Sequence, residues 1–346
     1  MGTRVVELVD SVRPDPYLAN GQKRDLLIRF WYPATLTGDC QPAEYTSARV
    51  WSYFAELVGV STRPAVVTNS CLNAPVAAGL HPVVVFSPGF TGTFTDYTFL
   101  FEDLASRGYV IASVDHTNEA TAVEFPDGRF VKSILGSYLG GPLRGDDLTL
   151  AFSALVRRQD LESVLDELQR MNSRAGNPLS SRMDLSRIGV AGHSLGGLTT
   201  ILAVEQEPRF RTGIVIDAIP PGKFMRVIQT PMMLLTAGRE NWDDDQCSLW
   251  NNLRGPRVVA NLVGAEHFAP SDLAWISPRT IKTGSSGVDD IVSAVRDSVA
   301  SFLDATLRGP VSQPLTEPHI GHPGLTVTMQ GQPQCDASST PRGNGL

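Results

Sequence analysis

The chain has 346 residues, of which 42% are hydrophobic, and its formal net charge is −7. This length and apolar content predict one large α/β domain, because a chain of this size can bury a substantial core. The acidic balance excludes a nucleic-acid-binding surface, and no apolar run is long enough to form a transmembrane helix.

Apolar and β-branched runs bounded by Gly, Pro or charged residues predict a series of strands that alternate with helices. Antiparallel opening strands are expected at residues 5–9 and 26–32. Further strands are expected at residues 83–86, 110–114, 188–191, 211–216, 231–236 and 257–263, and helices at residues 47–58, 97–106, 146–171, 198–204 and 288–307. We predict a single domain over residues 1–307 with insertions at about 43–79 and 117–145. The tail at 308–346, rich in Pro, Gly and Ser, is expected to lack a packed core.

The long helix at residues 146–171 has an unusual apolar pattern. Its apolar residues form two groups at helical spacing with a slip between them. The first group is Leu148, Phe152 and Leu155, and the second is Leu161, Leu165 and Leu168.

The most specific motif is the pentapeptide G-H-S-L-G at residues 192–196. It lies between an apolar strand at 188–191 and a helix that begins near Leu198. A G-x-S-x-G at a strand-to-helix turn is typical of the nucleophile elbow of the α/β-hydrolase fold, where small neighbours permit a sharp, strained turn. We therefore predict that Ser194 is a nucleophile; the alternative is a glycine-rich turn that happens to contain a serine.

The general base of such a serine is expected downstream, just past the last long strand. His267 follows the strand at 257–263 and fits this position. His116 follows an earlier strand and precedes Ser194, so we interpret it as a pocket-lining or structural hydrogen-bonding residue. His193 lies beside the serine rather than opposite it, and the other three histidines adjoin prolines.

The acid that orients the histidine has more than one candidate. Asp217 ends the strand that follows the elbow helix, and we favour it. Most α/β-hydrolases place the acid after the next strand, where Asn241 occupies the usual position. Glu240 and the cluster Asp243–Asp245 are the remaining alternatives there. A carboxylate is needed because it accepts the histidine Nδ1–H and stabilises the imidazolium.

Two backbone N–H groups should bind the oxyanion of the tetrahedral intermediate. One is the N–H of Leu195, next to the nucleophile, and the other is that of Phe90, after the strand at 83–86. Pro88 has no N–H, and Gly89 lets the loop turn toward the serine. No glycine-rich phosphate motif is present, and no Cys, His or carboxylate spacing predicts a metal site, so we expect no cofactor and no metal.

Several motifs together resemble a known family. They are Phe86-Ser-Pro-Gly-Phe90, D-L-A-S-R-G-Y-V-I-A at 103–112, Val114-Asp-His116, the elbow at 192–197, Ile216-Asp-Ala218 and His267. Over residues 5–307 the chain resembles the plasma-type platelet-activating factor acetylhydrolases and their microbial relatives. The resemblance implies an acid right after the elbow helix, at Asp217, and an ester with a short or oxidised acyl group. It departs at Ser87-Pro88-Gly89, where the family often has Ser-His-Gly, and residues 117–145 have no pattern that aligns.

The segment between Asp217 and Thr230 is too short for the large lid that many lipases carry after the acid-bearing strand. The two insertions should therefore shape the pocket. Apolar residues in them that suit an acyl pocket, or else anchor the insertions, are Trp51, Phe54, Leu57, Phe125, Ile134, Leu135, Tyr138 and Leu139.

Residues 1–15 carry charges and prolines where a signal peptide needs an apolar core. We therefore expect a cytoplasmic protein if Met1 is the natural start; if the N-terminus has been trimmed, secretion is the open alternative. The four cysteines are widely spread, so in the cytoplasm they should be free thiols. The alternative is a disulfide between Cys40 and Cys71, which flank one insertion.

These features predict a metal-independent serine esterase that forms an acyl-enzyme on Ser194 and acts on a small-molecule or lipid ester. The alternative is a free-standing biosynthetic thioesterase or acyltransferase that releases an acyl chain from an acyl carrier protein, to water or as a lactone. A non-catalytic binding protein on the same fold is disfavoured by the complete Ser–Asp–His set.

Overall fold

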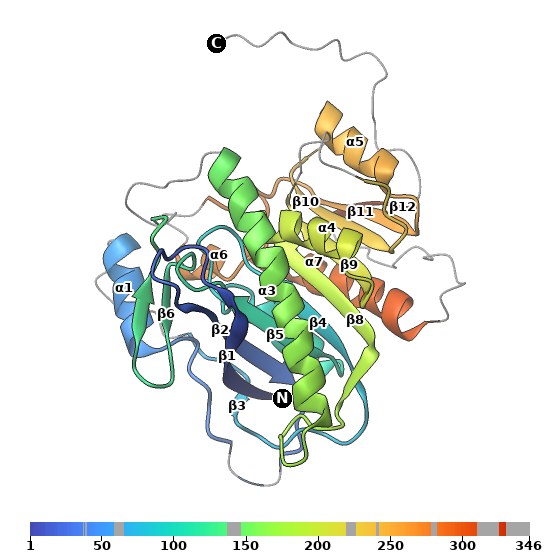
Figure 1. The fold of residues 1–346 in the computed structure, drawn as a ribbon. Coiled ribbons are helices and arrows are strands. Elements are labelled where there is room, and N and C mark those ends of the chain that lie inside the picture. Colours follow the sequence, from blue (N-terminus) through green and yellow to red (C-terminus); the bar gives the residue numbers. More distant parts are fainter. Residues whose placement is uncertain are drawn as a thin grey trace.

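A mixed ten-stranded sheet forms the centre of the computed structural model, which describes residues 1–36, 38, 40–58, 66–136, 147–218, 226–239, 242–277, 282–309 and 325–329 (Figure 1). Its strands are β1 (Gly2–Pro14), β2 (Lys23–Tyr32), β3 (Cys71–Leu72), β4 (His81–Ser87), β5 (Val110–Asp115), β8 (Met183–His193), β9 (Phe210–Ile216), β10 (Met232–Ala237), β11 (Arg257–Leu262) and β12 (Leu325–Met329). The strand order is β12-β11-β10-β9-β8-β4-β5-β2-β1-β3.

The strands from β5 to β11 in this order all run parallel, which confirms the mostly parallel sheet. The opening strands β1 and β2 are antiparallel, as predicted. At the other edge, β12 pairs antiparallel with β11. Because β12 lies at residues 325–329, the sheet takes in five residues of the predicted tail at 308–346.

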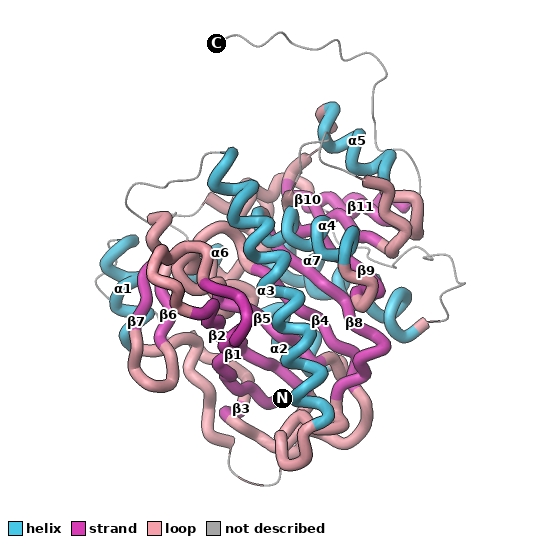
Figure 2. Tube along the Cα trace, in the orientation of Figure 1, coloured by secondary structure: helices cyan, strands magenta, loops and turns pink. Residues whose placement is uncertain are grey.

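Helices cover both faces of the sheet and enclose two apolar cores (Figures 1 and 2). One face is covered by α2 (Thr98–Ser106) and α7 (Val288–Leu303), which a π-helix (Asp304–Arg308) continues. The other face is covered by α3 (Asp147–Ser173), α4 (Leu195–Gln206) and α5 (Asp244–Asn252).

The two insertions lie side by side near one edge of the sheet. The first contains α1 (Ala48–Val58), which packs beside the hairpin of β6 (Ala122–Glu124) and β7 (Phe130–Lys132) from the second (Figure 1). The hairpin occupies part of residues 117–145, where the sequence has no pattern that aligns with the family. Short helix α6 (Leu273–Ile276) follows β11.

The slip in the apolar pattern of α3 has a structural cause. The second apolar group is buried, whereas Leu148, Phe152 and Leu155 are exposed. The inward positions between the groups are held by polar side chains, since Arg157 and Asp160 are fully buried. Helix α3 therefore contributes charged groups, as well as leucines, to the interior.

Cysteine pairing differs from the free thiols that we expected. Cys40 and Cys71 form a disulfide, which joins the segment after β2 to β3. Cys247 is also disulfide-bonded, and no cysteine in the described ranges is a free thiol. The first insertion is thus covalently closed at its base, as in the alternative considered from the sequence.

Candidate active site

Ser194 lies at a sharp turn between β8 and α4. Its backbone is strained, with φ 53° and ψ −118°, a conformation that non-glycine residues rarely adopt. A Cβ at Gly192 would lie 2.2 Å from the Gly196 carbonyl oxygen, and one at Gly196 would lie 1.9 Å from that of Ser87. Both glycines are therefore required by close backbone contacts, as expected for a nucleophile elbow.

The structure brings His267 and Asp217 together. His267 Nδ1 donates to Asp217 Oδ2 at 2.6 Å, although the residues come from the ends of different strands. The Ser194 N–H donates to the Ile216 carbonyl at 2.9 Å, which ties the elbow to the residue before Asp217. A hydrogen bond between Ser194 Oγ and His267 is not among those formed by the described residues. Such bonds are often long in a free enzyme and tighten with substrate.

Asp217 accepts hydrogen bonds from other groups besides His267. Its Oδ1 accepts from Arg239 Nε at 2.9 Å and from the Ala237 N–H at 3.1 Å. Burial opposes ionisation of this carboxyl. The hydrogen bonds from His267 and Arg239, the Arg239 charge and the Ala237 N–H outweigh it and lower the pKa of Asp217 to about 2. The carboxylate is therefore charged at any working pH.

The alternative acids have other partners or lie outside the described residues. Asp243 is exposed and caps α5, where its side chain accepts from the Gln246 N–H at 2.8 Å. Asp244 and Asp245 are exposed in the first turn of the same helix. Glu240 and Asn241 lie outside the described residues. Arg239, just before them, is the residue that reaches the active-site carboxylate from this strand end.

Phe90 and Leu195 lie close together beside the elbow, in one small apolar cluster. Leu195 is the first residue of α4, so its N–H belongs to the helix-terminal donors that lack an intrahelical acceptor. A Cβ at Gly89 would lie 3.7 Å from Ser194 Cβ, which places the loop before Phe90 against Ser194. Both proposed oxyanion donors thus border Ser194.

His193 supports the loop that carries His267, a role that the sequence did not reveal. Its Nε2 donates to the His267 carbonyl at 2.9 Å, and the two rings lie 4.5 Å apart. Burial, and then the nearby His267, lower the pKa of His193 to about 3. The ring is therefore neutral and keeps one N–H for this bond.

A buried polar network lies behind the loop before Phe90. His116 Nδ1 donates to Asp160 Oδ2 at 2.8 Å, and its Nε2 accepts from Ser87 Oγ at 3.0 Å. Asp160 also pairs with Arg24, at 2.7 Å. Burial lowers the pKa of His116 to about 4. This second Ser–His–Asp arrangement is enclosed and cannot meet a substrate, so His116 has the structural role and not the pocket-lining one.

Arg157 belongs to the same network and was also missed. Its guanidinium contacts Ser87, Pro88, Gly89 and the buried carboxylate of Glu119. The only hint in the sequence is the slip in the apolar spacing of α3, since Arg157 and Asp160 occupy that slip.

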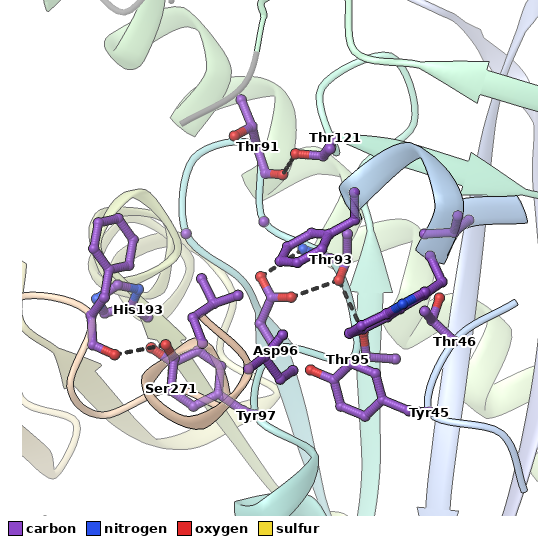
Figure 3. Close-up of a pocket in the computed structure, with 18 of the residues that line it drawn as sticks. Tyr45, Thr46, Thr91, Thr93, Thr95, Asp96, Tyr97, Thr121, His193 and Ser271 are labelled. Atoms are coloured by element: carbon purple, nitrogen blue, oxygen red, sulfur yellow. Dashed lines mark hydrogen bonds between the residues drawn. The ribbon is translucent and has the colours of Figure 1, made fainter. Parts of the chain in front are cut away.

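A pocket opens beside the loop that carries Phe90 (Figure 3). Tyr45, Trp51 and Phe54 of the first insertion form one aromatic wall, in which Trp51 and Phe54 stack at 5.4 Å. The other lining residues include Phe90, Tyr97, Phe268, Ile276, His193 and the hydroxyl-bearing Thr91, Thr93, Thr95, Thr121 and Ser271. Asp96 is the one carboxyl in this lining, and burial raises its pKa to about 6 despite hydrogen bonds from Thr93.

Some of the residues that we predicted for an acyl pocket line this pocket, and others lie elsewhere. Trp51 and Phe54 line the pocket, whereas Leu57 does not, and Phe125 is buried in the core. Ile134 is exposed, and Leu135 packs on the cluster of Phe90 and Leu195. Tyr138 and Leu139 lie outside the described residues.

The described ranges contain neither a cluster of metal ligands nor a membrane-spanning helix. No group of three or more Cys, His, Asp or Glu side chains there could hold a metal ion. None of the described helices is both long and apolar enough to cross a bilayer.

Comparison with known proteins identifies the relatives of this chain. A family model described as "Platelet-activating factor acetylhydrolase, isoform II" matches residues 17–127 and 160–297. The platelet-activating factor acetylhydrolase of Gallus gallus is 25% identical over 234 residues, 58% of this chain and 55% of that protein. Cutinase est2 of Thermobifida alba is 27% identical over 193 residues, 54% of this chain and 53% of that protein. The chain thus spans about half the length of these curated relatives.

A solved structure is similar over nearly the whole chain. It is a ferulic acid esterase from Streptomyces cinnamoneus, with 31% sequence identity and a TM-score of 0.80. The match covers 95% of this chain and 96% of the other. Together with the family model, it confirms the α/β-hydrolase fold and the family resemblance inferred from the motifs.

The neutral state of His193 predicts a specific pH dependence. Its pKa is about 3 in the folded protein against an ordinary 6.5, so the unfolded chain binds a proton between these values and the folded protein does not. Acidification therefore destabilises the fold through this residue, by about 2 kcal/mol between pH 7 and pH 5. His193→Gln removes the titration, so the variant should gain that amount relative to wild type when urea unfolding is measured at both pH values. A constant difference would mean that the native imidazole takes up the proton.

Proposed function

The chain belongs to the platelet-activating factor acetylhydrolase isoform II family, and on that premise we propose that it hydrolyses carboxylic esters through an acyl-enzyme on Ser194. The observation that carries the proposal is the His267–Asp217 pair beside the strained serine elbow. The relatives named as acetylhydrolase, cutinase and ferulic acid esterase are all named for ester hydrolysis, which supports the same chemistry.

Each step has a residue in a suitable place. Ser194 Oγ attacks the ester carbonyl carbon while His267 accepts the hydroxyl proton, and Asp217 holds the imidazole in the required tautomer. The Phe90 and Leu195 N–H groups stabilise the oxyanion. The intermediate collapses and expels the alcohol, which takes the proton from His267. Water, deprotonated by His267, then attacks the acyl-enzyme. The bond from the acyl group to Ser194 Oγ breaks, His267 returns the proton to Oγ, and the acid is released.

The pocket beside Phe90 is the proposed acyl site. Its aromatic wall suits an apolar or aromatic acid, while its threonine hydroxyls and Asp96 can bind polar substituents. Short-acyl esters, phospholipid-like esters and aromatic esters such as ferulates are therefore the substrates to compare. The three relatives named above carry the names of ester hydrolases and do not support an acyl carrier protein as partner.

The disulfides bear on the compartment. Disulfides persist in oxidising environments and are rare in the cytoplasm. The bridged Cys40, Cys71 and Cys247 therefore favour an oxidising compartment over the cytoplasm that we expected.

The nucleophile can be tested directly. A fluorophosphonate should label one serine only, and Ser194→Ala should abolish labelling and lower kcat for p-nitrophenyl esters by at least about 10³-fold, because triad residues act as a unit. Matched oxygen esters and thioesters of the same acids should be assayed together. Labelling that survives in Ser194→Ala would refute the elbow assignment, and a clear preference for thioesters or formation of lactone would favour the acyltransferase alternative.

The identity of the triad acid can be tested by replacing carboxylates that follow two different strands. Asp217→Asn should keep the fold and lower kcat by about 10⁴-fold, since the histidine loses the group that fixes its tautomer. Asp243→Asn is the matched control and should cost far less, because that exposed carboxyl caps a helix. A collapse of kcat in the Asp243 variant, with Asp217→Asn still active, would move the acid to the next strand.

The acyl site can be tested by removing part of its aromatic wall. Phe54→Ala should lower kcat/KM for esters of aromatic acids by about tenfold or more, the value of burying an aromatic side chain. It should leave p-nitrophenyl acetate nearly unchanged, because an acetyl group is too short to reach the wall. Trp275→Ala is the matched control, since Trp275 is an exposed aromatic residue that does not line this pocket. Equal effects on both esters would place the acyl group elsewhere.

A further inference from the structure

We propose that Arg157 is the positioning residue of the oxyanion loop, residues 87–90. It holds the peptide plane between Gly89 and Phe90 so that the Phe90 N–H faces the oxyanion. The inference rests on the proposed ester hydrolysis at Ser194 and assigns a role to a residue that touches neither the substrate nor the triad.

The guanidinium of Arg157 donates hydrogen bonds to three consecutive residues of this loop. Nη2 donates to the Gly89 carbonyl at 2.9 Å, and Nη1 donates to the Pro88 carbonyl and to Ser87 Oγ, the latter at 3.3 Å. The remaining contacts go to Glu119: Nε donates to Oε2 at 3.0 Å, and Nη2 donates to Oε1. The side chain has no exposed surface.

Holding the Gly89 carbonyl also determines where the next N–H points. The peptide bond is trans, so the C=O of Gly89 and the N–H of Phe90 point in opposite directions from one plane. The Gly92 N–H donates to the same carbonyl at 2.9 Å, so two donors hold it. With the carbonyl directed toward Arg157, the N–H is directed away from it.

The far side of the loop faces the elbow. A Cβ at Gly196 would lie 1.9 Å from the Ser87 carbonyl oxygen, and a Cβ at Gly89 would lie 3.7 Å from Ser194 Cβ. The loop is therefore confined between Arg157 of α3 and the start of α4. A rotation of the Gly89–Phe90 peptide plane would break the hydrogen bonds that the Gly89 carbonyl accepts from Arg157 and from the Gly92 N–H.

The charge of Arg157 needs a buried counter-ion and has one. Glu119 is fully buried, pairs with Arg157 and also accepts from Tyr17 Oη at 3.0 Å. A buried ion pair adds little net stability, because both ions lose their hydration. A planar fork, unlike a lysine ammonium, can donate to two successive carbonyls and a carboxylate together. Geometry at the loop therefore explains this pair better than stability does.

The experiment replaces Arg157 and Glu119 together, so that an effect on the orientation of the loop can be separated from an effect on folding. Arg157→Met with Glu119→Gln removes both charges, so no buried carboxylate is left unpaired. Loss of one oriented oxyanion donor should lower kcat for p-nitrophenyl esters by about 10²–10³-fold, with KM changed less than threefold. Inhibition by a trifluoromethyl ketone, whose adduct with Ser194 carries an oxyanion, should weaken by a similar factor.

A matched control isolates the effect of losing buried charge. Arg24→Met with Asp15→Asn removes another buried arginine of the same network and one of its two carboxylates, joined at 3.0 Å. The other carboxylate, Asp160, keeps Arg13 and His116 as partners, and neither replaced side chain hydrogen-bonds the loop. Both double variants should lower the melting temperature, because each removes buried polar contacts. The control should keep kcat, measured per serine titrated by a fluorophosphonate, within about threefold of the wild-type value. Equal kcat losses in both double variants, or unchanged kcat and ketone inhibition in the Arg157 variant, would overturn the proposal.

A conservative variant decides the matter if the double variant does not fold. Arg157→Lys can reach one carbonyl but not the full set, so kcat should fall about tenfold or more while KM is kept. Wild-type kcat and ketone inhibition in this variant would overturn the role of Arg157. Failure of the proposed function appears separately, as wild-type protein that neither turns over esters nor reacts with a fluorophosphonate at Ser194.

Discussion

The ion pair between Arg157 and Glu119 connects most of the features on which the proposed chemistry depends. It anchors α3 to the loop at the end of β4, and that loop lies against the serine elbow. Because both ions are buried, loss of either one would leave the other as an unpaired charge in the interior, which costs several kcal/mol. The interaction therefore constrains the loop, the helix and the elbow as one unit.

The proposed catalytic residues lie at one edge of the sheet because the parallel strands that they follow all end there. Ser194, Asp217 and His267 follow β8, β9 and β11, and Arg239 follows β10, the strand between the last two. This arginine lies two residues before Asn241, where an acid is common in the fold, and it hydrogen-bonds the carboxylate of Asp217. Asp217 and Arg239 together form a neutral pair, whereas a carboxylate alone carries one negative charge.

The pocket depends on segments that are distant in the sequence. Trp51 and Phe54 come from an insertion closed by the Cys40–Cys71 disulfide, whereas Asp96 and Phe90 follow β4 and Phe268 follows β11. The apolar character of the first insertion indicated part of this wall. The threonine hydroxyls and Asp96 were not predicted, because short polar residues in a loop have no pattern that distinguishes a pocket lining from a solvated turn.

The sequence by itself determined the elements whose signals are local. The elbow glycines, the apolar strands and the positions of Ser194, Asp217 and His267 along them follow from steric limits and side-chain alternation within a few residues. Only the tertiary structure decided the partners: Arg157 with Glu119, Arg239 with Asp217, His193 with the His267 carbonyl and Cys40 with Cys71. These pairs join residues brought together by the fold, and a hydrogen bond or ion pair acts over a few ångströms of space regardless of separation along the chain.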